Sequence, residues 1–311
     1  MIASLLERFR QGDRLALARL LTLVAQSKNL ADIADQIPKP KSTCRVVAFT
    51  GSGGVGKSTL IGKLIEHIRG QNLTVAVLAC DPESPLSGGA LLGDRFRMPS
   101  RPKDDGVFIR SLATQSGHGA IAENLALMVQ LCAGFGFDVV LIETVGAGQG
   151  ESAVRDLADV VVLLLQPETG DELQWEKAGI LEVADIFAVN KADLPGADLV
   201  AAQVRASIEL SGHAAAVLEV SAKTDQGLAE LWQAIQAVGK KHTPVPAEKE
   251  LLRLAQQELN CRFHTALASG DRNLQSLIDQ FRQGGLSELE AVLGVLNLFS
   301  NDPLPWKTPK S

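Results

Sequence analysis

The sequence has few cysteines and no apolar segment long enough to cross a membrane. Its four cysteines, Cys44, Cys80, Cys132 and Cys261, are dispersed and form no C-x-x-C pair, so we expect buried free thiols in a reducing cytosol. A membrane helix needs roughly 18 apolar residues in succession, and no run approaches that length. The N-terminal stretch MIASLLERFRQGDR carries charge too early for a secretory signal. These absences predict a cytoplasmic protein without membrane association.

Positive charge is not in excess either. The chain has 30 Lys and Arg against 36 Asp and Glu, a net charge of −6. Proteins that bind nucleic acid usually cluster basic residues to neutralise phosphates, so nucleic acid is not expected as the main partner. With 46 % apolar and 21 % charged residues, the 311-residue chain should form a packed core. Its length suits one large α/β domain with extensions, or roughly two domains.

Short, almost continuously apolar runs alternate with helical patterns in the middle of the chain. Such runs are typical of strands buried on both faces, and they predict a mostly parallel sheet flanked by helices, an α/β fold. The predicted strands are 45–50, 74–80, 106–112, 138–144, 159–165, 185–190 and 215–221. The predicted helices between them include 58–70, 120–134 and 224–238.

Helical patterns without strands flank this central region. Residues 2–36 show helical spacing with a break at Gly12-Asp13, and the prolines of PKPK end the segment. Beyond HTPVPAEKE, helices are predicted over 247–268, 272–283 and 286–299. We therefore expect an N-terminal helical arm (1–42), a nucleotide-binding domain (43–240) and a C-terminal helical extension (241–311).

A glycine-rich loop follows the first predicted strand and opens a helix. Residues 51–58, GSGGVGKS, match G-x-x-x-x-G-K-[ST], in which backbone N–H groups and the lysine hold a triphosphate. The same letters contain the weaker dinucleotide pattern G-x-G-x-x-G, but the adjacent Lys-Ser pair favours the triphosphate loop of a P-loop NTPase. The predicted phosphate-binding residues are Gly53, Gly54, Val55, Gly56, Lys57, Ser58 and Thr59.

Two later stretches indicate that the base is guanine. NKAD (190–193) ends an apolar strand, and Asp193 can accept hydrogen bonds from the guanine N1–H and 2-amino groups, which adenine lacks. Asn190 would brace the loop, and Lys191 would lie over the ring. SAK, formed by Ser221, Ala222 and Lys223, follows the next strand, where the Ala222 N–H could reach guanine O6. Together they favour GTP and GDP over ATP.

Acidic residues near the predicted strand ends suggest a Mg²⁺ site. Where Ras-like GTPases have D-x-x-G, this chain has Glu143-Thr-Val-Gly146. Glu143 and Ser58 are therefore expected to hold Mg²⁺, with Asp81 and Asp94 in or near its shell. Lys57 and Glu143 are the predicted catalytic residues. Gln149 is a third candidate, either orienting water or serving a structural role.

The sequence resembles the MeaB/ArgK-type GTPases associated with methylmalonyl-CoA mutase, a SIMIBI-class P-loop family. The resemblance lies in the P-loop, in VLACDPESPLSGGALLGDRFRM, in FDVVLIETVGAGQGE and in GDELQWEKAGILEVADIFAVNKADLPGA, and covers roughly residues 10–240. The family loop commonly reads G-x-P-G-A-G-K-S, whereas Gly53-Gly54-Val55 stands here.

The resemblance implies a GTP-hydrolysing chaperone for an adenosylcobalamin-dependent acyl-CoA mutase. GTP binding and hydrolysis would gate cofactor loading and protect the mutase. The family also implies a homodimer that uses helical extensions, and switch segments at 143–155 and 168–175. Because no Ras-like glutamine follows the ETVG stretch, we expect slow intrinsic hydrolysis that a partner accelerates. Arg95 and Arg155 are candidate arginine fingers.

Two alternatives remain open at this stage. A transport-linked ATPase or kinase acting on basic amino acids is a label sometimes attached to the family, and NKAD argues against it. A metal-delivery GTPase would need clustered His or Cys, whereas this chain has five dispersed histidines and four dispersed cysteines. Competition between GTP and ATP would test the first alternative, and a nickel titration the second.

Overall fold

The computed structural model describes two compact units, Met1–Lys241 and His242–Ser311. In the first unit the described residues are 2–26, 31–34, 36–39, 41, 43–82, 104–114, 124–144, 151–167, 184–212 and 215–240. In the second they are parts of 251–300, with 269–300 described without a break.

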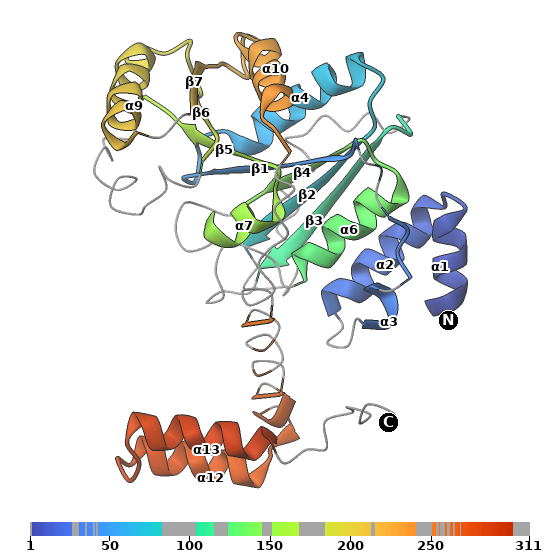
Figure 1. The fold of residues 1–311 in the computed structure, drawn as a ribbon, viewed down its shortest axis with the longest axis vertical. Coiled ribbons are helices and arrows are strands. Elements are labelled where there is room, and N and C mark those ends of the chain that lie inside the picture. Colours follow the sequence, from blue (N-terminus) through green and yellow to red (C-terminus); the bar gives the residue numbers. More distant parts are fainter. Residues whose placement is uncertain are drawn as a thin grey trace. The chain divides into compact units, whose positions relative to one another are not determined.

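A seven-stranded sheet forms the centre of the first unit, and all its neighbouring strands are parallel (Figure 1). The α/β fold predicted from the apolar runs is therefore confirmed. The strands are β1 (Arg45–Gly51), β2 (Val75–Pro82), β3 (Val107–Thr114), β4 (Val139–Glu143), β5 (Val160–Leu165), β6 (Ile186–Val189) and β7 (Ala216–Glu219).

The strand order, β3-β2-β4-β1-β5-β6-β7, makes β1 the point where the chain changes direction across the sheet. From β1 the chain goes to β2 and β3 on one side, returns to β4, and then crosses β1 to β5, β6 and β7. In parallel α/β sheets, ligands bind in the crevice at the carboxyl ends of the strands beside such a reversal. The glycine-rich loop leaves β1 at this position.

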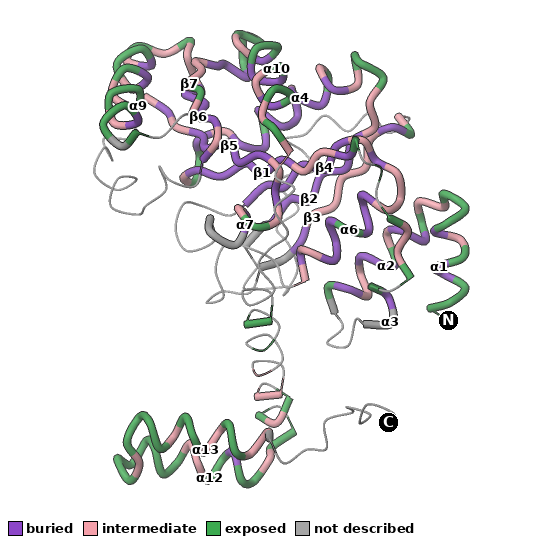
Figure 2. Tube along the Cα trace, viewed as in Figure 1, coloured by how far each residue is buried: buried purple, intermediate pink, exposed green. Residues whose placement is uncertain are grey.

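Alternate strand residues face two helical layers. The helices of the first unit are α1 (Ile2–Arg10), α2 (Arg14–Gln26), α3 (Ala31–Ala34), α4 (Lys57–Gly70), α6 (Leu125–Phe135), α7 (Glu151–Leu157), α9 (Ala197–Ser211) and α10 (Leu228–Ala237). Val47 and Phe49 of β1 belong to the core beneath α4 and α10, whereas Ala48 between them belongs to the core beneath α2, α6 and α7. Figure 2 shows the strands buried between these layers.

The N-terminal helices pack onto this unit. The break between α1 and α2 is at Gly12, whose φ of +82° suits glycine, and Asp13 accepts a hydrogen bond from the Leu15 N–H over 2.8 Å to cap α2. The Phe9 ring of α1 lies 5.4 Å from the Phe135 ring of α6, centroid to centroid. The α1–α2 hairpin thus extends the core on the α6 side.

Helix α10 begins later than the sequence pattern suggests. The predicted helix 224–238 corresponds to an observed helix from Leu228 to Ala237. Residues 221–226 instead form a tight loop, closed by a hydrogen bond of 2.9 Å from the Ser221 N–H to the Gln226 carbonyl. Gly227, with a φ of +71°, then starts the helix.

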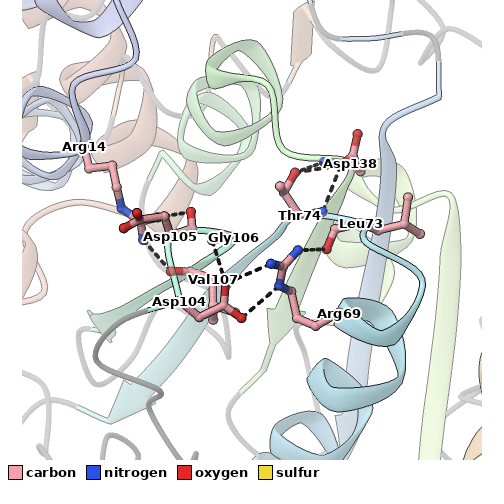
Figure 3. Close-up of polar contacts among 9 residues, drawn as sticks. All are labelled: Arg14, Arg69, Leu73, Thr74, Asp104, Asp105, Gly106, Val107 and Asp138. Atoms are coloured by element: carbon pink, nitrogen blue, oxygen red, sulfur yellow. Dashed lines mark hydrogen bonds and ion pairs between the residues drawn. The ribbon is translucent and has the colours of Figure 1, made fainter.

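Charged side chains hold together the edge of the sheet where the strands begin (Figure 3). Asp138 precedes β4 and accepts hydrogen bonds from the backbone and hydroxyl of Thr74, at 2.8 and 2.7 Å. Arg69, in the last turn of α4, binds both carboxylate oxygens of Asp104 at 3.0 and 2.9 Å. Arg14 donates to the carbonyls of Asp105 and Val107. These contacts fasten the starts of β2, β3 and β4 to helices on both layers.

The second unit contains a helical hairpin of α12 (Arg272–Arg282) and α13 (Glu288–Ser300). Asp271 caps α12 by accepting from the N–H groups of Asn273 and Leu274, at 2.9 and 3.0 Å. Ser287 and Glu290 form a capping box at α13, with 2.8 Å from the Ser287 N–H to Glu290 Oε2. The described residues within the predicted helix 247–268 are all helical.

Candidate functional site

The glycine-rich loop joins the end of β1 at Gly51 to the start of α4 at Lys57. Gly51 has a φ of +141°, and a Cβ there would lie 2.5 Å from the Leu164 carbonyl oxygen of β5. Gly56 has a φ of +96°, and its Cβ would lie 2.5 Å from Asn190 Nδ2. Both positions therefore require glycine for conformation and for space. The loop directs the N-terminus of α4 to the carboxyl edge of the sheet, where helix N–H groups and dipole favour a phosphate.

The predicted phosphate-binding residues differ in exposure. Gly53, Gly54 and Thr59 are exposed, whereas Val55 is buried. Lys57 is only 8 % exposed, and its Nζ donates to the carbonyls of Gly51 at 2.8 Å and Ser52 at 3.0 Å. The ammonium group is therefore held against the first residues of the loop. A positive charge held at a glycine-rich loop is an arrangement that suits a polyphosphate.

Ser58 and Glu143 meet at the magnesium side of the predicted site. The Ser58 hydroxyl donates to Glu143 Oε1 over 2.6 Å, and the two residues are 7 % and 4 % exposed. A hydroxyl and a carboxylate placed together are the hard oxygen ligands that Mg²⁺ prefers. The residues present thus fit the ion.

The other predicted metal and catalytic residues are only partly described. Asp81 lies on β2, two residues beyond Ala79, which pairs with Glu143. Its backbone is therefore near the same end of the sheet, while its side chain lies outside the described residues. Asp94 and Gln149 also lie outside them.

The predicted base-recognition residues come together at the ends of β6 and β7. Asp193 Oδ1 accepts a hydrogen bond of 2.6 Å from the buried Ser221 hydroxyl, and Lys223 Nζ lies 3.5 Å from Oδ2. The bond from Ser221 is the main reason that the pKa of Asp193 is lowered below its ordinary value. Lys191 has a φ of +61°, uncommon for a residue with a side chain. The Asp193 carboxylate is thus kept ionised and oriented, as an acceptor for paired donors must be.

Asn190 connects the two loops. Its Nδ2 donates to the Val55 carbonyl of the phosphate loop over 2.8 Å, and its Oδ1 accepts from the Ala222 N–H over 3.4 Å. Because Asn190 is only 3 % exposed, both contacts are shielded from water. The sequence predicted that this residue braces the site, but the pattern NKAD alone does not indicate which loops it joins.

Arg155, a candidate arginine finger, lies at the other edge of the sheet. Its guanidinium donates to Asp185 Oδ1 over 3.0 Å, and Asp185 directly precedes β6. Since all strands are parallel, the start of β6 is at the opposite edge from the glycine-rich loop. Arg155 therefore ties α7 to the start of β6, and the finger interpretation is wrong for this arrangement. Arg95 lies outside the described residues.

Two further structural features concern membrane-spanning helices and clusters of metal-binding side chains. Across the described residues, every helix is too short or too polar to span a bilayer. The same part of the chain contains no group of three or more His, Cys, Asp or Glu side chains that could hold a metal ion.

Comparisons with known proteins place the chain among GTPases. The family model described as methylmalonyl Co-A mutase-associated GTPase MeaB matches residues 17–266. A Pyrococcus abyssi protein named as a GTPase is 43 % identical over 244 residues, 76 % of this chain and 75 % of that protein. The fused isobutyryl-CoA mutase of Nocardia farcinica is 37 % identical over 269 residues, 81 % of this chain and 25 % of that protein.

A solved structure agrees with the fold. The crystal structure of an LAO/AO transport system kinase matches with a TM-score of 0.63 and 24 % identity, covering 96 % of this chain and 97 % of that one. At this identity the match supports the fold and not the activity. The family match, in contrast, covers most of the chain. The chain belongs to the MeaB family of methylmalonyl-CoA mutase-associated P-loop GTPases.

Proposed function

We propose that this GTPase controls the loading of adenosylcobalamin into an acyl-CoA mutase and protects the loaded mutase. The observation that supports this most directly is the Nocardia farcinica protein named fused isobutyryl-CoA mutase. One segment of that mutase chain is homologous to this protein. A fusion keeps two activities at a high effective concentration, which is useful when they act in sequence.

The nucleotide would be GTP or GDP, recognised through Asp193. The carboxylate accepts from guanine N1–H and the 2-amino group, while Ser221 holds it in place through the bond of 2.6 Å. Adenine offers no matching pair of donors, so ATP would leave a desolvated carboxylate unpaired. Ala222 and Lys191 would contact the remaining edge and face of the base.

Mg²⁺ would be held by Ser58 and Glu143, with Asp81 and Asp94 as further carboxylates at the same end of the sheet. When bound, the ion neutralises charge on the β- and γ-phosphates. Lys57 adds a second fixed positive charge, and Gln149 is the candidate to orient water. With Arg155 bound to Asp185 instead of facing the phosphates, slow hydrolysis that the mutase accelerates is the expected behaviour.

The decisive experiment uses the full chain with a purified adenosylcobalamin-dependent mutase, either methylmalonyl-CoA or isobutyryl-CoA mutase. We expect the mutase to raise the GTP hydrolysis rate at least tenfold. We also expect cofactor transfer, followed by cobalamin absorbance, to differ between GTP and GDP. The matched control is Lys57→Ala, which should remove both effects. Unchanged hydrolysis and unchanged loading with both mutases would contradict the proposal.

We also propose that the chain is a homodimer through its C-terminal helices. One side of α13 packs on α12, where Gly294 lies close to Leu277. The opposite side carries four exposed apolar residues, Leu289, Val292, Leu293 and Leu296, at 68, 55, 49 and 44 % exposure. A helix that is apolar on both sides is usually buried on both, and a second copy can cover this stripe symmetrically.

Sedimentation of the full chain tests the dimer. Leu293→Glu should shift it to a monomer, because a charge would be buried at the centre of the stripe. The control is Leu210→Glu on α9, also an exposed leucine, at 90 %. It should leave the mass unchanged. A wild-type monomer at micromolar concentration would exclude this interface.

A further inference from the structure

The loop at 221–226, which carries the SAK residues, is in contact with the helix that begins at the phosphate loop. Near the far end of α4, His67 Nε2 lies 3.1 Å from Asp225 Oδ1. Asp225 has a φ of +64° and forms the tip of the loop. The two residues are 158 positions apart in the sequence, and none of the recognised motifs includes either of them.

Hydrogen bonds within the loop transmit the effect of this contact. It is closed internally by the Ser221–Gln226 backbone bond of 2.9 Å and by a bond of 3.3 Å from the Thr224 N–H to the Ser221 hydroxyl. Ser221 in turn positions Asp193. A contact at Asp225 therefore acts, through the closed loop, on the residue that orients the base-recognising carboxylate.

We propose that His67 and Asp225 form a tether that positions the guanine-recognition loop against the phosphate helix. The inference rests on the proposed guanine site, and it makes His67 a positioning residue. The contact joins an imidazole nitrogen on α4 to a carboxylate oxygen at the tip of the loop, 3.1 Å apart. Guanine nucleotide affinity should therefore depend on both side chains.

Other charged groups on the surrounding elements already have partners or lie on neighbouring turns. On α4, Lys63 pairs with Glu66 at 3.6 Å, and Arg69 binds Asp104. On the loop, Lys223 lies near Asp193, and Glu230 is in the first turn of α10. Glu66 is next to His67 in sequence and does not contact the loop in any described interaction, so it offers a matched control.

The test is calorimetric binding of Mg²⁺-GDP and of Mg²⁺-ADP to the full chain. His67→Ala should weaken GDP binding about two- to fivefold, the range for an exposed polar pair. His67→Gln keeps a hydrogen-bond donor, so it should restore part of the affinity. Asp225→Gly, which tolerates the positive φ, should reproduce His67→Ala. Glu66→Gln should match the wild type.

The outcomes separate this inference from the guanine site itself. If the wild type prefers GDP to ADP but His67→Ala and Glu66→Gln bind GDP equally, the tether is excluded and the guanine site stands. Additive losses in a His67→Ala, Asp225→Gly double variant would also exclude it, because contacting partners must couple. If the wild type shows no preference for GDP, the guanine site fails and the tether fails with it.

Discussion

Asn190 donates a hydrogen bond of 2.8 Å to the carbonyl of Val55, so the NKAD segment and the phosphate loop are directly joined. The contact is buried and joins residues 135 positions apart. The proposed binding of one guanine nucleotide by both loops requires such a fixed relative position.

Asn190→Ala would leave the Val55 carbonyl buried without this donor. We expect a loss of about 1–3 kcal/mol in the free energy of unfolding and about tenfold or more in GTP affinity. Urea unfolding and calorimetry measure the two. Gln236→Ala, which removes an exposed bond of 3.0 Å to Gln71, is the control and should change neither. Equal behaviour of the two variants would contradict the bridging role.

Asp193→Asn should change which base is preferred. The amide no longer offers two acceptor oxygens to guanine N1–H and the 2-amino group, whereas xanthine carries a 2-oxo group that can accept from it. We expect GTP affinity to fall at least 100-fold and XTP binding to exceed GTP binding, as measured by competition. Retained GTP preference in this variant would remove Asp193 from base recognition.

The glycines of the phosphate loop should differ in their tolerance of alanine. Gly51→Ala and Gly56→Ala each place a Cβ 2.5 Å from a neighbour at a positive φ, so each should lower stability by more than about 1 kcal/mol. Gly53 has nothing within 4 Å of a Cβ and no positive φ, so Gly53→Ala should unfold near the wild-type temperature. Thermal unfolding without nucleotide checks this order, and a large loss at Gly53 would contradict it.

Glu143→Gln should weaken nucleotide binding only when Mg²⁺ is present. The glutamine keeps the size of the side chain and can still accept from Ser58, but it lacks the charge that holds a divalent cation. We expect GTP affinity in Mg²⁺ to fall about tenfold or more and affinity in EDTA to change little. An equal loss in both conditions would indicate that Glu143 acts on the fold and not on the ion.

Asp138 should make the fold sensitive to acid. Burial raises the pKa of this carboxyl, but the hydrogen bonds from Lys41 and Thr74 outweigh burial and leave the pKa below the ordinary value of 3.8. A lowered folded-state pKa stabilises the protein above the unfolded value, and that stability is lost as pH falls through the folded value.

The matching variant is Asp138→Asn. It should lower the free energy of unfolding by about 2 kcal/mol at neutral pH. The difference in the free energy of unfolding between wild type and variant should stay constant between about pH 8 and pH 5 and become smaller below about pH 4. Asp279→Asn, an exposed aspartate at 61 %, is the control. If this difference did not change with pH down to the point of acid unfolding, the Asp138 charge would not be the cause of the stabilisation.

The strands and the phosphate loop could be predicted because their signals are local. A buried parallel strand has a continuous apolar sequence. The glycines of the phosphate loop and Lys57 are close together in the sequence. The start of α10 was predicted too early, since the helical pattern at 224–227 is overridden by the Ser221–Gln226 bond that closes the loop. Tertiary contacts of this kind leave no periodic signal.

By itself, the sequence determined the α/β class, the phosphate loop and the expectation that Asp193 recognises guanine, because each depends on residue types at short, fixed spacings. The tertiary structure alone decided that Ser58 meets Glu143 across 85 residues, that Arg155 lies at the opposite edge from the glycine-rich loop, and that His67 reaches Asp225. The physical reason is the strand order: which strand ends lie together depends on how the whole sheet packs.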